Sequence, residues 1–144
     1  MSVINLDQQI VTEKVFIIGG KQRYVKINDE TIGFVTESTA SAASIQYELG
    51  KKVETLEKLE ETGKELDIYK ESKTVIEEMT ESLREVTWKF FDSLCGNDTG
   101  KEIYNYYHKS TQAMLAVMQL VEQEMDVAKK ENRENKRKKY QKSR

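Results

Sequence analysis

A short apolar run and a run of mixed apolar and polar residues stand close together early in the chain, in residues 11–27 (VTEKVFIIGGKQRYVKI). The runs VFII and RYVKI are rich in β-branched and aromatic residues, and the Gly19-Gly20 pair between them offers the conformational freedom of a tight turn. A period of two directs Tyr24 and Val25 to opposite faces. The pattern predicts a β-hairpin with one buried and one wet face. It must pack on another element, because an isolated hairpin is marginally stable in water.

A helical period follows the hairpin directly. Asn28 or Asp29 offers an N-cap, with acidic residues in the first turn. Residues of a buried stripe then recur at spacings of three and four: Ile32, Val35, Thr39, Ala42, Ile45, Leu49, Val53, Leu56 and Leu59. The small residues of STASAAS within this stretch favour close helix packing, with a flexible or bent segment as the alternative. Gly63 interrupts the pattern, so the helix either breaks there or continues at a cost of about 1 kcal/mol.

Two more long helices and a short one complete the pattern. The second long helix has a stripe of Ile76, Met79, Leu83, Val86, Phe90 and Leu94, broadened by Trp88 and Phe91. Gly96 is placed to end it as a C′ glycine. Asp98 or Thr99 can cap a short helix through KEIYNYYHK, and Ser110 can cap the last one. The last helix carries Met114, Leu115, Val117, Met118, Val121 and Met125.

The end of the chain has no large apolar residue after Val127, except Tyr140. We therefore expect a mainly α fold, a bundle of long and short antiparallel helices with a small N-terminal β-hairpin. Residues 1–127 form the predicted domain. Residues 128–144 are predicted to be a basic, partly disordered tail, in which a fraying helix passes into disorder.

Charge is distributed unevenly. Residues 128–144 carry nine Lys or Arg and two Glu, a net charge of +7, and the other 127 residues carry 14 basic and 23 acidic side chains, a net charge of −9. The tail is open to three interpretations: it solubilises the protein, docks on an acidic protein or binds nucleic acid. Nucleic-acid binding is the least favoured, because the body is acidic and no nucleic-acid-binding motif is present.

The remaining composition narrows the class of protein. There is no proline, which permits long uninterrupted helices, and no apolar run approaches the length of a membrane span. No signal peptide is recognisable, and the single cysteine excludes an internal disulfide framework. We expect a soluble, unsecreted protein of a reducing cytoplasm, without a membrane segment.

The single cysteine and the single histidine of the chain, which are candidate catalytic residues, lie in one stretch, LCGNDTGKEIYNYYHKS. It contains Cys95, Asp98 and His108. A cysteine nucleophile needs its base within hydrogen-bond reach. Thirteen positions and a helix break separate Cys95 from His108, and no catalytic-cysteine signature surrounds the thiol. One Cys and one His also supply only two of the four protein ligands that a structural zinc site needs. We therefore expect Cys95 to fill a small apolar place in the last turn of a helix, and we predict no catalytic residues, no metal site and no cofactor.

The strongest functional candidate is a cluster of aromatic and methionine side chains near the C-terminus. Methionine surfaces adapt to varied apolar helices, so the cluster suggests a groove that opens to a partner. Ordinary core packing is the favoured interpretation for most of these side chains, and the groove is the functional alternative. The residues predicted to contact a client protein are Tyr104, Tyr107, Met114, Leu115, Met118 and Met125.

The order of these parts resembles a known family. The hairpin VFIIGGKQRYVKI, the cap NDETI, the charged helical middle and the closing FFDSLCGNDTGKEIYNYYHKSTQAMLAVMQLVEQEM together resemble the tail assembly chaperones of long-tailed bacteriophages of Gram-positive hosts. The resemblance covers roughly residues 11 to 127 and is one of layout. It implies a helical, non-enzymatic protein that keeps the tape-measure protein soluble and recruits tail-tube subunits. The rival expectation is a small helical structural or adaptor protein of a virion or host assembly, and either one is compatible with a homo-oligomer.

Overall fold

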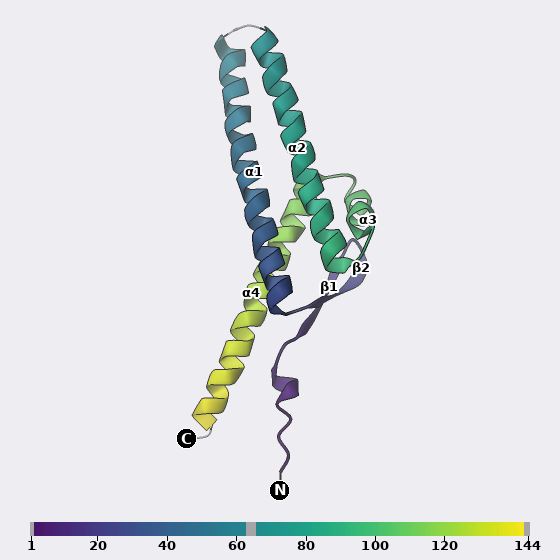
Figure 1. Cartoon of the computed structure of the whole chain (residues 1–144), viewed down its shortest axis with the longest axis vertical. Helices are drawn as coiled ribbons and strands as arrows, with labels where there is room; N and C mark the ends of the chain where they lie inside the picture. Colours follow the sequence, from purple (N-terminus) through teal and green to yellow (C-terminus); the bar gives the residue numbers. More distant parts are fainter. Residues whose placement is uncertain (1, 63–65, 143–144) are drawn as a thin grey trace.

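The computed structural model describes residues 2–62 and 66–142, which form one hairpin, four α-helices and a short 3-10 turn (Figure 1). The elements in chain order are the 3-10 turn Asp7–Gln9, β1 Glu13–Ile18, β2 Lys21–Lys26, α1 Asp29–Thr62, α2 Leu66–Cys95, α3 Thr99–Tyr106 and α4 Thr111–Lys142. The mainly α fold with a small N-terminal hairpin is confirmed.

The hairpin has the predicted turn and the predicted two faces. Its antiparallel register pairs Ile18 with Lys21, and Gly19 and Gly20 adopt φ angles of 63° and 76° in the turn. Side chains without this glycine freedom rarely adopt such angles. Val25 is buried with Ile18, while Tyr24 points to the exposed face.

Helix ends follow the predicted capping chemistry at three sites. The Asn28 carboxamide oxygen accepts a hydrogen bond from the Thr31 amide (2.8 Å), and the Ser110 hydroxyl oxygen accepts one from the Ala113 amide (3.1 Å). α2 ends at Cys95, and Gly96 follows with a φ of 116°. Asp98 stands at the N-cap position of α3 in a left-handed conformation, but its side chain makes no capping hydrogen bond.

The core lies where the hairpin, α3 and α4 meet the lower halves of α1 and α2 (Figure 1). The buried phenylalanine Phe90 contacts Phe34 in a stacked arrangement and Phe91 edge to face, at centroid distances of 5.9 Å and 4.9 Å. Ala42, from the small-residue stretch, is buried, and the nearby Thr39 hydroxyl donates a hydrogen bond to Glu122 of α4. The helix is continuous through the small-residue stretch, where the alternative was a flexible or bent segment, and close packing is limited to one side of it: Ala40, Ser41, Ala43 and Ser44 are exposed.

α1 and α2 continue beyond this core as an antiparallel pair, which we call the two-helix arm (Figure 1). The described part of the arm comprises roughly residues 45–62 and 66–82. Gly63 lies outside the described residues, so the choice between a break and a continuous helix is not decided at that position.

The last helix corrects the predicted domain boundary at residue 127. α4 runs without interruption to Lys142, so the described part of the tail is helical throughout, where we expected a fraying helix that passes into disorder. Ala128 is completely buried, and the Asn132 carboxamide accepts a hydrogen bond from the Val11 amide (2.8 Å) and donates one to its carbonyl (3.1 Å). Glu131 pairs with Lys14 at 3.4 Å. The domain therefore extends at least to Asn132.

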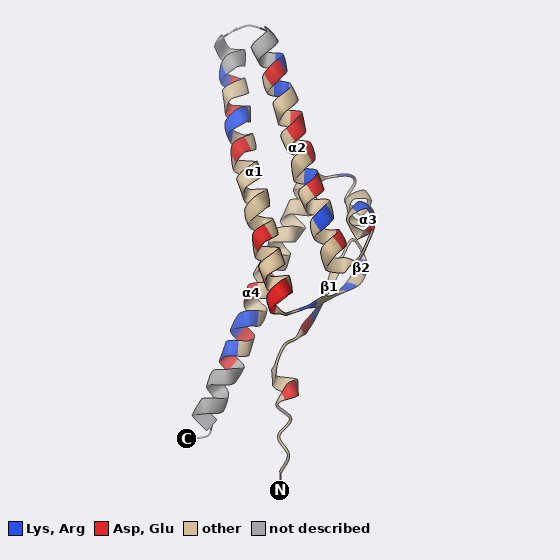
Figure 2. Cartoon of the chain, in the orientation of Figure 1, with Lys and Arg blue, Asp and Glu red and all other residues tan. Residues whose placement is uncertain are grey.

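Charged side chains line the outer surfaces of the arm, and basic and acidic residues alternate on α4 beyond the core, as far as its side chains are described (Figure 2). In the described part of the chain, no helix is both long enough and apolar enough to cross a membrane.

Candidate protein-binding site

The methionine and tyrosine cluster predicted to bind a client is part of the core. Met114, Leu115, Met118 and Met125 are buried almost completely, and Tyr104 retains only 9% of its exposure. The apolar stripe of α4 packs against α1 and α2, so these side chains present no open groove. The prediction that they line a client groove is therefore wrong for the folded chain, and their role is packing.

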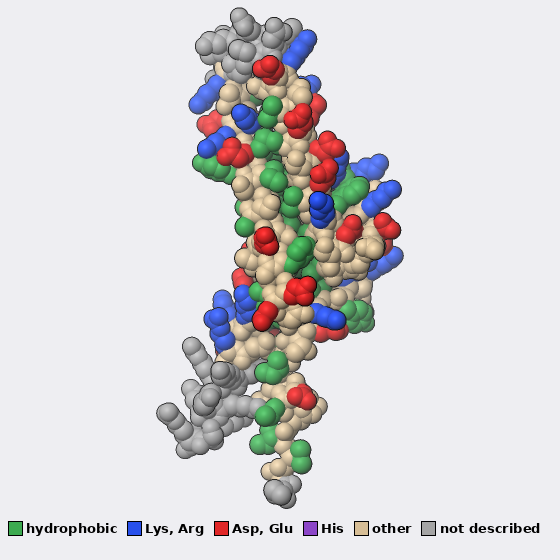
Figure 3. Space-filling model, viewed as in Figure 1, with side chains coloured by type: hydrophobic (Ala, Val, Ile, Leu, Met, Phe, Trp, Pro, Cys, Tyr) green, Lys and Arg blue, Asp and Glu red, His purple; other side chains and the backbone are tan. Residues whose placement is uncertain are grey.

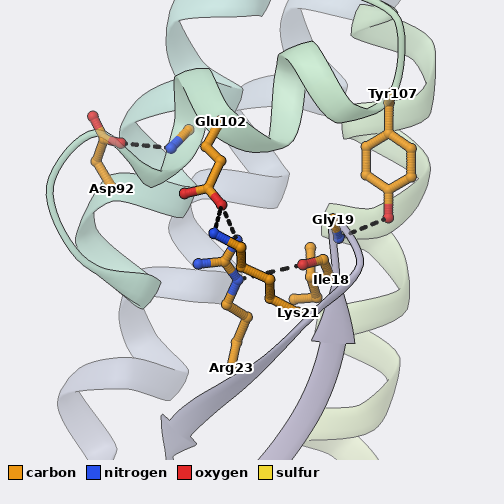
Figure 4. A network of polar contacts seen from close by, with 8 residues as sticks. Ile18, Gly19, Lys21, Arg23, Asp92, Glu102 and Tyr107 are labelled. Carbon is orange, nitrogen blue, oxygen red and sulfur yellow. Dashed lines mark hydrogen bonds and ion pairs between the residues drawn. The ribbon is translucent and has the colours of Figure 1, made fainter.

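Tyr107 is partly buried and has a structural role of its own. Its hydroxyl oxygen accepts a hydrogen bond from the Gly19 amide at 3.3 Å, which ties the hairpin turn to the segment after α3 (Figure 4). Its ring also meets that of Tyr106 edge to face at 5.1 Å. Tyr107 therefore positions the hairpin.

A charged contact secures the same hairpin to α3 (Figure 4). The Glu102 carboxylate meets the ammonium group of Lys21 at 2.5 Å and the guanidinium group of Arg23 at 3.4 Å. The hydrogen bond from Lys21 is the main reason that the pKa of Glu102 is lowered. Arg23 also donates to the Ile18 carbonyl at 3.3 Å. The network is a clamp between β2 and α3.

The start of α3 is clamped to α2 in turn. The Asp92 carboxylate accepts a hydrogen bond from the Gly100 amide at 2.7 Å (Figure 4). Tyr104, one turn further along α3, packs edge to face against Trp88 at a centroid distance of 5.3 Å. These contacts hold α3 against α2, and the Glu102 contacts hold the hairpin against α3.

Cys95 has the structural position that the sequence predicts, at the last residue of α2. It is half-buried, and burial raises the pKa of the thiol, an effect that the nearby Arg23 guanidinium partly opposes. A raised pKa keeps the group protonated at neutral pH and disfavours the nucleophilic thiolate. His108 is exposed after α3, and no group of three or more His, Cys, Asp or Glu in the described part of the chain could hold a metal ion.

A hollow of about 550 Å³ lies between α2 and α3. Its lining mixes the cations Arg84, Lys101 and Lys109 with the carboxylates of Glu81 and Glu85. Trp88 also lines it, but the indole nitrogen is buried and has no hydrogen-bond partner in the described structure. The mixed charge favours no class of ligand.

The two-helix arm offers a different kind of surface, an apolar seam between its helices. Side chains of both helices line the seam and stay partly exposed, because only two helices are present to cover them. They are Ile45, Leu49, Val53 and Leu56 of α1 and Val75, Ile76 and Met79 of α2. The space-filling view shows hydrophobic side chains running between α1 and α2 along the arm, with charged groups on either side (Figure 3).

The seam residues of α1 were predicted as a buried stripe, and only the lower part of that stripe is buried. Val35 and Ala42 are in the core, whereas Val53, higher on the same stripe, is 37% exposed. Periodicity indicates which face of a helix is apolar, but it does not show how many neighbours cover that face.

A second apolar surface, on the hairpin and the residues before it, was not predicted from the sequence. Val15 and Ile17 of β1 and Tyr24 of β2 lie on the outer face of the hairpin and are exposed, as are Val3, Ile4 and Leu6 before it. The signal was present in the sequence, because a period of two places Val15 and Ile17 on the face of Tyr24.

Comparisons with protein-family models, curated proteins and solved structures find no match for this chain.

Proposed function

We propose that the chain is a non-enzymatic assembly protein that binds an amphipathic helix of a client protein along the seam of its two-helix arm. The main observation that supports this proposal is the partly exposed apolar seam, which extends away from the core over several helical turns. Apolar side chains that stay exposed in a row on a soluble surface commonly mark a protein interaction site.

A helix is the client element that fits this surface best. Two packed helices leave a groove along their shared seam, and a third helix fills it by placing its side chains between theirs. The α2 side of the described arm carries four carboxylates, Glu71, Glu77, Glu78 and Glu81, and two cations, Lys70 and Lys73. A client helix with basic residues beside its apolar stripe therefore has complementary charge.

The resemblance to phage tail assembly chaperones makes the proposal more specific. The client is then the tape-measure protein, a long helical protein that needs its apolar surface covered before the tail forms. Tail-tube subunits are the second partners, and the site of action is the cytoplasm of the bacterial host. Neither a cofactor, a nucleic acid nor a membrane is part of the proposed activity.

Co-expression with the tape-measure protein encoded in the same genome tests the proposal. We expect the client to be recovered soluble and bound to the chain. Val53→Glu places a charge in the seam, and we expect it to lower the amount of bound, soluble client about tenfold or more, equivalent to at least ~1.4 kcal/mol.

Tyr47→Glu is the matched control on the opposite face of α1. Tyr47 is 64% exposed, and its ring contacts Lys51 outside the seam. We expect this variant to bind the client normally, and both variants to keep the helical circular dichroism of the parent. Equal binding by the parent and Val53→Glu would refute the seam as the binding site.

The structural or adaptor role is the second candidate, and the exposed apolar residues of the hairpin favour it. A structural protein keeps its contacts in the finished assembly, whereas a chaperone leaves. Mass spectrometry of purified particles distinguishes them: a stoichiometric amount of this chain in the finished particle would support the structural role, and its absence the chaperone.

A further inference from the structure

The outer edge of β1 carries backbone groups that point away from the hairpin at every second residue. The two-residue turn makes Ile18 and Lys21 a hydrogen-bonded pair, and hydrogen-bonded pairs recur at every second position of an antiparallel ladder. The bond from the Ile27 amide to the Thr12 carbonyl (2.8 Å) fits this pattern. Odd-numbered residues of β1 therefore direct their N–H and C=O groups to the edge.

Side chains close this edge at both ends. At Val11, Asn132 accepts from the amide and donates to the carbonyl, as a neighbouring strand would. At Gly19, the Tyr107 hydroxyl accepts from the amide. Between these two points, the outward groups of Glu13, Val15 and Ile17 have no hydrogen-bond partner among the described residues.

The open part of the edge is also apolar. Val15 and Ile17 are 48% and 75% exposed. Of the two charged residues in this part of β1, Glu13 stands at its start, and Lys14 lies on the opposite face of the hairpin, where it pairs with Glu131. Natural monomers commonly protect a strand edge with charges, proline or a covering element, because an open edge pairs with another strand. Residues 15–17 of this edge contain no charge and no proline, which is typical of a strand-addition site.

The chain also contains a segment that fits the site. Residues 2–6 (SVINL) adopt no regular helix or strand, and Val3, Ile4 and Leu6 are 93%, 69% and 53% exposed. Five extended residues span roughly 17 Å, which matches the five residues from Glu13 to Ile17. On an extended strand, Ile4 and Leu6 share a face and continue the apolar face of Val15 and Ile17.

Within a single chain, residues 2–6 lie away from the open edge of β1. The Asn132 contacts fix Val11, and the residues before it lead away from the hairpin through the turn at Asp7–Gln9 (Figure 1). We propose that residues 2–6 add as a strand to the open β1 edge of a second copy, and that the two copies exchange these segments reciprocally. This gives a closed two-fold dimer in which each copy supplies both a segment and an edge.

Sedimentation of the full chain over a range of concentrations tests the proposal. We expect a dimer, and we expect deletion of residues 2–6 to raise the dissociation constant about tenfold or more. This deletion should preserve the fold, because no side chain in the segment is buried. A monomer at every concentration, or a dimer that the deletion leaves unchanged, would overturn the proposal.

Proline substitutions test the edge itself. Val15→Pro removes one outward N–H but no hydrogen bond of the hairpin, and Tyr24→Pro makes the same change at the directly opposite position on β2. We expect only Val15→Pro to weaken the dimer, with native circular dichroism for both. An equal effect of the two variants would assign the dimer to another surface.

Disulfide trapping identifies the source of the strand, in a Cys95→Ser background. Chains carrying Ile4→Cys and differently tagged chains carrying Val15→Cys are mixed and oxidised, and we expect the mixed crosslink between them, because Ile4 lies opposite Val15 when residues 2–6 pair with residues 13–17. A single chain that carries both cysteine substitutions is oxidised as the counter-test. A crosslink formed only within single chains would show that the segment folds back on its own hairpin, and it would refute the exchange.

Discussion

At the scale of single residues, α3 crosses α2 at a point where a methyl group has no room. A Cβ atom on Gly100 would lie 2.5 Å from the Trp88 carbonyl oxygen and 2.8 Å from its Cα, which are backbone atoms. We expect Gly100→Ala to lower the free energy of unfolding by about 1–3 kcal/mol. Gly50→Ala, where a Cβ meets no atom within 4 Å, should raise it by about 0.5–1 kcal/mol. Urea denaturation of both variants checks the contrast, and a neutral Gly100→Ala would contradict the close crossing.

The Cys95 thiol gives a second test at this scale. Burial raises its pKa and the positive charge of Arg23 lowers it, so Arg23→Gln should move the pH midpoint of thiol alkylation further upward. A group with a raised folded pKa favours the protonated form, and its contribution to stability is lost as pH rises through that pKa. Lys26→Gln removes a charge from the same strand and should leave the midpoint in place. A downward shift in Arg23→Gln would contradict the assignment.

At the scale of elements, local chemistry predicted where most elements begin and end. Capping and turn residues contact groups only a few positions away, so their roles can be predicted from the sequence. They are Asn28, Ser110, Gly96 and the Gly19-Gly20 turn. The groove prediction failed because a methionine stripe looks the same whether a partner or the chain's own helices cover it. The boundary at 127 failed because Asn132 acts on Val11, which is 121 positions away.

The corrected boundary makes a prediction about truncation. Ending the chain after residue 134 should leave the free energy of unfolding nearly unchanged, because the sequence beyond has little apolar surface to bury. Ending it after residue 128 removes Glu131 and Asn132 and should lower that free energy by about 1–3 kcal/mol, since the Val11 groups lose their partner. Asn132→Ala in the full chain should reproduce most of the loss. Equal stability of the two truncations would return the boundary to residue 127.

At the scale of the whole molecule, burial decreases along α2 from the core toward the arm. Leu83, Phe90 and Phe91 are buried, whereas Ile76 and Met79 have a single neighbouring helix and stay partly exposed. Local opening costs less where fewer apolar contacts must break. We therefore expect the arm to have a lower local stability than the base, which is a suitable property for a surface that accommodates a client helix.

Hydrogen exchange measures this gradient directly. We expect the amides of residues 70–79 to exchange at least about tenfold faster than those of residues 83–91, which corresponds to a difference in opening free energy of at least ~1.4 kcal/mol. Bound client should slow exchange in residues 45–58 and 70–79 and leave the base unchanged, because the seam lies only in the arm. Uniform exchange along α2 would show that the arm and base open as one unit. Protection confined to the hairpin would instead move the client site from the seam to the N-terminal apolar surface.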